Sequence, residues 1–282
     1  MTGKISNTIK LMKSSWRILK DDKQLLLFPL ISGICISLVT VLFIIPLLLD
    51  PNIRHQLMSD SSSSTATPVS VSVLQYALLF IFYFFNYFVV TFFNTGLIAC
   101  AIRRMHGENA TFTSGLRDAL QRLHQIAGWS LIAASVGVII QLIENKSDIV
   151  GKIVASILGM SFSIASFFVI PIMVTENKSP FAALSESKSL FFKSWGEQFI
   201  AYTGFGLILC LFWIPGIALF VIGFNIKSIL CIVIAILYCI VMLLTQAALH
   251  AVFQAALFYY CKNGKTPTNF DATAMQMAFK VA

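Results

Sequence analysis

The side chains of this sequence that could do chemistry in an apolar environment are a few amides and one imidazole. Gln246, His250 and Gln254 are spaced by four residues within one long apolar stretch, so a helix would place them on one face. Asn86 and Asn94 lie eight residues apart in another such stretch and would also share a face. We therefore predict an intramembrane polar seam between these two helices, in which the imidazole could carry a proton.

Two interpretations of this polar seam stay open. Polar side chains in lipid usually point into a helix bundle and pair or line a cavity, so the seam could serve a small transporter or channel. Alternatively, the amides form hydrogen bonds between helices, which contribute about 0.6 kcal/mol each and at most ~1.7 kcal/mol. Because no acidic residue accompanies the histidine in the apolar stretches, we favour the packing interpretation over a proton relay.

The sequence lacks the motifs of known catalytic and metal sites. Its four histidines are scattered, and no metalloprotease, nucleophile-elbow or P-loop motif occurs. The six cysteines have no C-x-x-C spacing and lie within or beside apolar stretches, which is typical of buried free thiols. We predict no catalytic residues, no metal site and no cofactor, and therefore a protein that is not an enzyme.

Six long apolar stretches provide the helices that would hold these side chains. The hydrophobic fraction is 57% and the charged fraction only 11%, against about 25% charged residues in soluble domains. Each stretch is close to the ~20 residues that cross a ~30 Å hydrocarbon core as a helix. We predict an all-α polytopic membrane protein with six transmembrane helices at Leu25–Leu49, Val73–Ile102, Ile126–Ile143, Ile153–Thr175, Phe199–Gly223 and Ser228–Tyr260.

These stretches predict a single helical membrane domain over residues 1–282. It has three segments, an amphipathic N-terminal helix at 1–24, a six-span bundle at 25–262 and a cytoplasmic tail at 263–282. Gly264 is placed to end the sixth span. The segment Thr268–Asp271 resembles a capping box that opens a short helix in the tail.

The distribution of basic residues predicts the orientation in the membrane. The chain has 20 lysines and arginines, and all but Arg54, Lys146, Lys152 and Lys227 fall on one side of the predicted topology. Basic loops stay on the cytoplasmic side, so both termini are predicted to be cytoplasmic. The net charge of +8 then indicates contact with anionic lipid rather than with nucleic acid.

The N-terminal segment has the pattern of a basic amphipathic helix. Its apolar residues recur at helical spacing, at Ile5, Ile9, Met12, Trp16 and Leu19. Such a helix is suited to lie among headgroups with its tryptophan at the interface. We predict that anionic headgroups contact the basic residues of this segment and of the second loop, namely Lys10, Lys13, Arg17, Arg103 and Arg104.

Two further amphipathic segments are predicted on the same side. One has an apolar stripe of Leu116, Leu120, Leu123 and Ala127, with Ser114 as its cap. The other opens at Ser179-Pro180 and continues through Phe181, Leu184, Phe191 and Trp195. Each of the three amphipathic segments precedes two spans and is accompanied by a tryptophan. This arrangement fits either a threefold internal repeat or the usual enrichment of tryptophan at membrane interfaces.

Short motifs spread along the chain resemble a bacterial family of six-span membrane proteins without an assigned function. The motifs are Ser15-Trp16-Arg17, Leu26-Leu27-Phe28-Pro29-Leu30, Pro171-Ile172-Met173-Val174, Ser179-Pro180-Phe181-Ala182-Ala183-Leu184 with Ser187 and Leu190, Trp195-Gly196-Glu197-Gln198, Phe270-Asp271 and Ala278-Phe279-Lys280. The resemblance implies a multi-pass protein of the bacterial cytoplasmic (inner) membrane. The 171–195 stretch is also distantly similar to the membrane domain of some glycerophosphodiester phosphodiesterases. Since the soluble phosphodiesterase domain and its acidic cluster are absent, this second resemblance implies a lipid context only.

These observations favour a non-enzymatic membrane protein that binds or organises lipid. The predicted partners are membrane lipids with anionic headgroups, and a homo-oligomer or a membrane-protein partner is also open. The alternative is a transporter or channel for small solutes or lipids that uses the polar seam. A membrane enzyme acting on lipids would need clustered acids or histidines, and the sequence shows no such cluster.

Overall fold

The structure is a computed structural model that describes residues 2–49, 73–146, 149–193, 210–267 and 270. Every regular element in these residues is a helix, which confirms the predicted all-α class. Five helical segments are long and apolar enough to cross a membrane, at Lys23–Ile45, Tyr76–Met105, Leu123–Glu144, Ile149–Glu176 and Ile229–Asn263. They correspond to the first, second, third, fourth and sixth predicted spans. Residues 199–209 of the predicted fifth span lie outside the described part of the chain.

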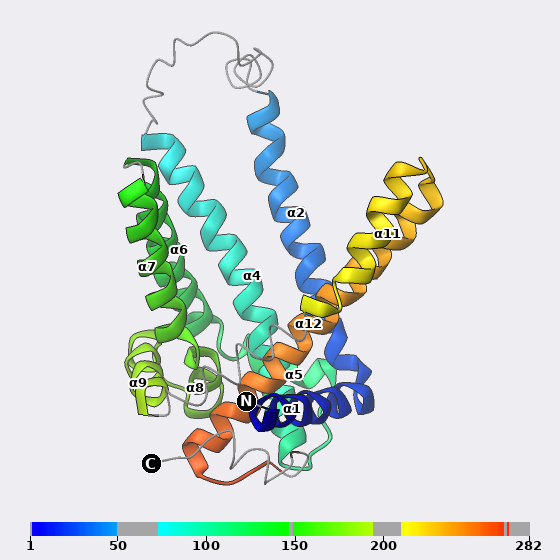
Figure 1. The fold of residues 1–282 in the computed structure, drawn as a ribbon. Helices are drawn as coiled ribbons and strands as arrows, with labels where there is room; N and C mark the ends of the chain where they lie inside the picture. Colours follow the sequence, from blue (N-terminus) through cyan, green and yellow to red (C-terminus); the bar gives the residue numbers. More distant parts are fainter. Residues whose placement is uncertain (1, 50–72, 147–148, 194–209, 268–269, 271–282) are drawn as a thin grey trace.

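The long helices follow one another along the chain as three pairs. The pairs are α2 (Leu27–Leu49) with α4 (Val73–Met105), α6 (Leu123–Lys146) with α7 (Ile149–Ser166), and the shorter apolar helix α11 (Ile214–Asn225) with α12 (Ile229–Asn263). Helix α4 of the first pair also packs closely against α6 of the second. Figure 1 shows the third pair leaning away from the other two. Close contact within it depends on glycine, because a Cβ at Gly223 would lie 2.9 Å from Cys231 Cβ.

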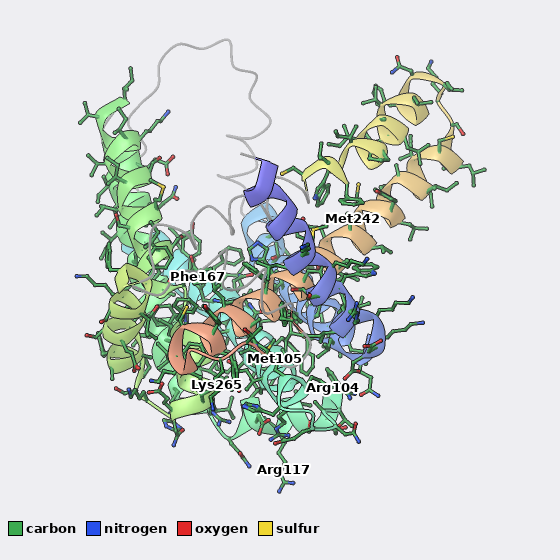
Figure 2. The ribbon with its side chains drawn as sticks, turned by 60° about the horizontal axis from the view of Figure 1, so that its bottom comes forward. Arg104, Met105, Arg117, Phe167, Met242 and Lys265 are labelled. Carbon is green, nitrogen blue, oxygen red and sulfur yellow. The ribbon has the colours of Figure 1, made fainter. Side chains whose placement is uncertain are left out.

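The shorter helices gather at one end of the bundle, shown at the bottom of Figure 1. They are α1 (Thr2–Asp21) with the 3₁₀ turn η1 (Lys23–Leu26), α5 (Phe112–Leu120), α8 (Val169–Glu176) and α9 (Pro180–Lys193). We call this the basic end, because most of the described lysines and arginines lie on these helices or on the adjoining ends of α4, α6 and α12. The same end holds the largest cluster of buried side chains, around Phe28, Ile98, Met105, Ile172 and Phe253 (Figure 2 shows Met105 at this end). Toward the other end, apolar residues such as Leu42 and Leu237 are exposed, as helices that face lipid require.

The fourth span, Ile149–Glu176, contains a two-residue break in its helix. Helix α7 ends at Ser166 and α8 begins at Val169. Pro171 has no N–H, so the carbonyl four residues earlier, that of Phe167, has no helical donor. The break therefore follows from the proline.

The faces by which the amphipathic helices pack differ from the predicted apolar stripes. In α1 the buried positions include Leu11, Ser15 and Ile18, whereas Trp16 is 50% exposed. In α5 the buried residues are Gly115, Asp118 and Ala119, and in α9 they include Ala183, Ser187 and Phe191. Small side chains such as Gly115, Ala119 and Ala183 let these short helices approach the bundle closely. The bulky apolar residues are divided, since Leu11 and Phe191 are buried whereas Trp16 and Leu120 are exposed.

Helix ends also refine the sequence predictions. Ser114 was expected to cap α5, and this is wrong: the N-cap is Thr111, whose hydroxyl accepts from Ser114 N, and Ser114 is the third helical residue of the capping box. Gly264 does end α12, with φ 63° and its N–H donating to Tyr260 O. The short tail helix predicted after Thr268 lies outside the described residues, as does Trp195.

We predict that Gly115→Ala destabilises the protein, because α5 crosses α4 without space for a side chain. A Cβ at Gly115 would lie 2.5 Å from Cys100 Sγ and 2.6 Å from Gly96 O. Overpacking of this kind costs about 1–3 kcal/mol, which thermal unfolding in detergent would reveal as a lower Tm. Gly33→Ala in α2 is the matched control, because its Cβ meets no atom within 4 Å. Equal Tm values for the two variants would contradict this packing.

Candidate functional site

Two arginines at the end of α4 form ion pairs that connect this helix to η1 and to α5. Arg104 Nη2 lies 2.9 Å from the buried carboxylate of Asp22, which also caps η1. Arg103 Nη2 lies 2.9 Å from both carboxylate oxygens of Asp118 on α5. The Arg104–Asp22 pair joins α4 to η1, which is distant in the sequence. The Arg103–Asp118 pair joins α4 to α5 across the loop between them. Hydrogen bonds between ionised partners are stronger than neutral ones, so these contacts fix the positions of η1 and α5.

Four charged residues form a second network between α8, α9 and α12. Lys178 Nζ lies 2.6 Å from Glu176 Oε2 and also pairs with Glu186, while Lys262 Nζ lies 2.7 Å from Glu186 Oε1 and also pairs with Glu176. Burial by itself would raise the pKa of Glu186, but the hydrogen bonds from Lys178 and Lys262 lower that pKa below its ordinary value of 4.5. Hydrogen bonds to Glu176 and Glu186 raise the pKa of Lys178 above its ordinary value of 10.5.

Arg122 and Gln125 donate hydrogen bonds to backbone carbonyls at the C-terminal end of α8. Arg122 Nη2 donates to Val174 O at 2.8 Å and its Nε donates to Met173 O at 3.3 Å. Gln125 Nε2 donates to Asn177 O at 3.0 Å, where Asn177 has a left-handed conformation. These donors satisfy carbonyls that a helix end leaves without partners. Long-range contacts of this kind carry no local sequence signal, so the sequence did not predict this role for Arg122 and Gln125.

The residues predicted to contact headgroups fall into two groups. Arg103 and Arg104 take part in the ion pairs described above. Lys10, Lys13 and Arg17 are exposed on the outer face of α1, next to Trp16. Among the described residues, no carboxylate lies within ion-pair distance of these three cations.

The residues of the predicted polar seam bind several different groups. Asn86 Nδ2 donates to Phe82 O in its own helix at 2.8 Å. Gln246 Oε1 accepts from Trp213 Nε1, just before α11, at 2.9 Å. Gln254 Nε2 donates to Phe167 O, the carbonyl that Pro171 leaves without a helical donor. Asn94 and His250 are half-buried on the same two helices, α4 and α12.

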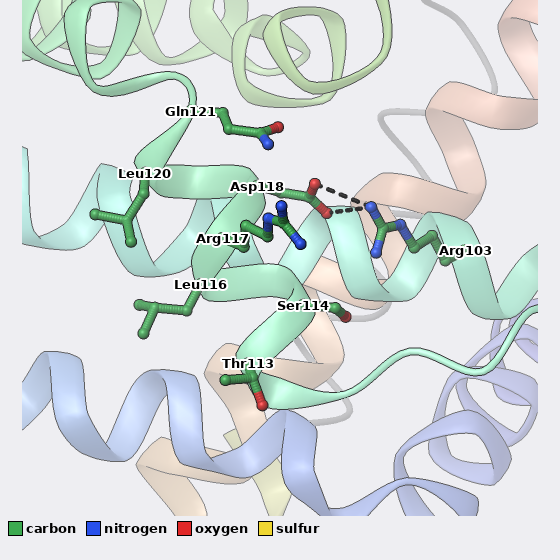
Figure 3. Close-up of a pocket in the computed structure, with 8 residues that line it drawn as sticks. All are labelled: Arg103, Thr113, Ser114, Leu116, Arg117, Asp118, Leu120 and Gln121. Atoms are coloured by element: carbon green, nitrogen blue, oxygen red, sulfur yellow. Dashed lines mark hydrogen bonds and ion pairs between the residues drawn. The ribbon is translucent and has the colours of Figure 1, made fainter.

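Helix α5 also borders a surface cavity of about 630 Å³ (Figure 3). It is lined by Arg103, Thr113, Ser114, Leu116, Arg117, Asp118, Leu120 and Gln121. In Figure 3 the leucines point to one side of α5, and Arg117 lies on the side of the Arg103–Asp118 pair. The only sequence signal for this cavity is the alternation of leucine with charged residues along α5. Within the described residues, His, Cys, Asp and Glu form no group of three or more that could hold a metal ion.

Comparison with known proteins identifies a family but no activity. The model of a family of unknown function, DUF6159, matches residues 73–268, which is well over half of the chain. No curated protein matches the chain, and no solved structure matches it. The expected membership of a family without an assigned function is confirmed at this level.

We predict that Gln254→Leu destabilises the protein, because the hydrogen bond from the Gln254 amide to the carbonyl of Phe167 would be lost. A hydrogen bond of this kind contributes about 0.5–1.5 kcal/mol, and thermal unfolding in detergent measures the loss. Asn86→Leu is the matched control, because Asn86 bonds only a carbonyl of its own continuous helix. Changes in stability of the same size for both variants would contradict the role given to Gln254.

We predict that the network of Glu186 is strongest between about pH 4.5 and 10.5, and that acid weakens it. A carboxylate whose pKa is lowered by folding stabilises the protein above its unfolded pKa and loses this effect as the pH falls through its folded pKa. Thermal unfolding from pH 7 to pH 3 should show a smaller loss of Tm in Glu186→Gln than in the unmodified protein. Glu108→Gln, an exposed residue outside the network, should retain the full loss.

Proposed function

The chain belongs to DUF6159, a family of unknown function, and we propose that it is a non-enzymatic integral membrane protein that binds anionic lipid headgroups at its basic end. In this proposal six helices cross a bacterial inner membrane, with the fifth span including α11. Both termini and the amphipathic helices are cytoplasmic. The partners are the anionic lipids of that leaflet.

The outer face of α1 is the observation that carries this proposal. One face of the helix, which includes Leu11 and Ile18, is buried at the basic end. The opposite face presents Lys10, Lys13 and Arg17 without an ion-pair partner among the described residues. A helix held in this way presents its charges from a fixed position, so little conformational entropy is lost when lipid binds.

The charge and the exposed tryptophan suit an anionic membrane surface. Each lysine or arginine near such a surface contributes about 1 kcal/mol of attraction. Trp16 is 50% exposed beside these cations, and tryptophan prefers the headgroup level because its ring is amphipathic. Three cations and one tryptophan on a single face are therefore adequate for preferential association with anionic lipid.

We predict that Lys10→Gln with Lys13→Gln lowers the preference of the protein for anionic lipid by roughly thirtyfold, since two charges that each contribute about 1 kcal/mol of attraction are lost. The measurement is electron paramagnetic resonance of spin-labelled phosphatidylglycerol and phosphatidylcholine around the reconstituted full-length protein. The ratio of their association constants reports the preference.

The matched control for this experiment is Lys152→Gln with Lys227→Gln, which removes two exposed lysines from the opposite end of the bundle. It should leave the preference nearly unchanged. An unmodified protein without any preference for phosphatidylglycerol would refute the proposed function. Equal losses in the two double variants would point to net charge rather than to α1.

A further inference from the structure

We propose that the surface cavity on α5 binds the phosphate group of one anionic phospholipid, with Arg117 and Arg103 at the phosphate and the leucines of α5 beside the acyl chains. This inference rests on the proposed function, because it assigns one defined site within the lipid-binding end of the molecule. It concerns a different helix from the basic face of α1, so the two can be tested separately.

The cavity lies at the level expected for lipid headgroups. Arg103 is in the last turn of α4, whose candidate span ends at Met105. The next candidate span begins at Leu123, directly after α5. Helix α5 is therefore placed between the ends of two membrane-crossing helices, where phosphates of the bilayer lie.

Two guanidinium groups give the cavity its affinity for phosphate. Asp118 holds Arg103 through the Nη2 atom alone, so within the described residues the remaining N–H groups of Arg103 stay available. Arg117 is exposed, and no carboxylate of the described chain lies within ion-pair distance of it. Arginine binds phosphate through two parallel N–H groups. With two arginines and one aspartate, the cavity keeps a positive charge.

The apolar side of the cavity indicates a lipid phosphate rather than a free one. Leu120 is 51% exposed and adjoins the cavity, and Leu123 and Leu131 continue an exposed apolar track onto α6 at 39% and 50% exposure. This track includes Leu120 and Leu123 of the stripe that the sequence predicted for this segment. Inorganic phosphate gains no binding energy from an apolar surface, whereas an acyl chain that covers the track removes apolar area from water, which favours binding.

The backbone around the cavity is held in place before any ligand binds. Thr111 and Ser114 cap the N-terminal end of α5 reciprocally, and Phe112 N donates to Gln24 Oε1 at 3.0 Å. Gly115 of α5 lies so close to Gly96 of α4 that no side chain would fit between them. A site on a fixed helix loses little entropy when it binds a ligand, which favours one retained lipid over a diffuse layer.

Native mass spectrometry of the full-length protein in detergent, titrated with phosphatidylglycerol, tests this inference. The unmodified protein should bind a first lipid more tightly than later ones, and Arg117→Gln should weaken that first binding about tenfold. Lys227→Gln, between α11 and α12 at the opposite end of the bundle, also removes one exposed cation and should leave the first lipid in place. Because Arg117 is exposed, Arg117→Gln should retain the Tm of the unmodified protein, which confirms that it folds.

Three outcomes separate the alternatives. An unchanged first lipid in Arg117→Gln would overturn the site, and the proposed function would stand if phosphatidylglycerol were still preferred over phosphatidylcholine. Displacement of the first lipid by an equal concentration of inorganic phosphate would show a free-anion site and overturn the lipid assignment. Loss of the first lipid in Leu120→Ser, without competition by inorganic phosphate, would support the lipid assignment.

Discussion

A helix that crosses lipid must satisfy its backbone hydrogen bonds within the protein, and the most consequential case here is the carbonyl of Phe167. Pro171 removes its helical donor, and the amide of Gln254 on α12 replaces that donor. On the other side of the break, Phe168 N donates to Ser187 Oγ on α9 at 2.9 Å. Two other helices, α12 and α9, thus bind the backbone on the two sides of the break. The position of α8, α9 and α12 at the basic end depends on these contacts.

The same constraint keeps charge out of the spans and concentrates it at one end. There the acidic residues are used for structure, because the described ion pairs join Asp22, Asp118, Glu176 and Glu186 to Arg104, Arg103, Lys178 and Lys262. Basic residues outnumber acidic ones, 20 to 12. The surplus cations cannot all be neutralised within the protein. Those on the outer face of α1 and at Arg117 have no ion pair with a described carboxylate, and our proposals assign them to anionic lipid.

The sequence predicted the long helices well because a run of apolar residues leaves the backbone few alternatives in lipid. Helix ends with local signals, such as Gly264, could also be predicted. The packing faces of the short helices could not, because Leu116 and Leu120 have the pattern of a core stripe yet lie beside a surface cavity. Periodicity alone does not say whether a stripe faces protein or lipid.

The division of the cations explains why the predicted headgroup contacts are not equivalent. Arg104 is bound by Asp22 and by Asn109 Oδ1 at 3.2 Å, so neutralising it removes support for η1 as well as a charge. Lys10 and Lys13 form no ion pair with a carboxylate of the described chain, so replacing them changes the surface charge and leaves the fold intact. A site that combines both kinds of cation, as Arg103 and Arg117 do beside α5, can be rigid and still hold charge for a ligand. This combination distinguishes a specific lipid site from general attraction to a membrane.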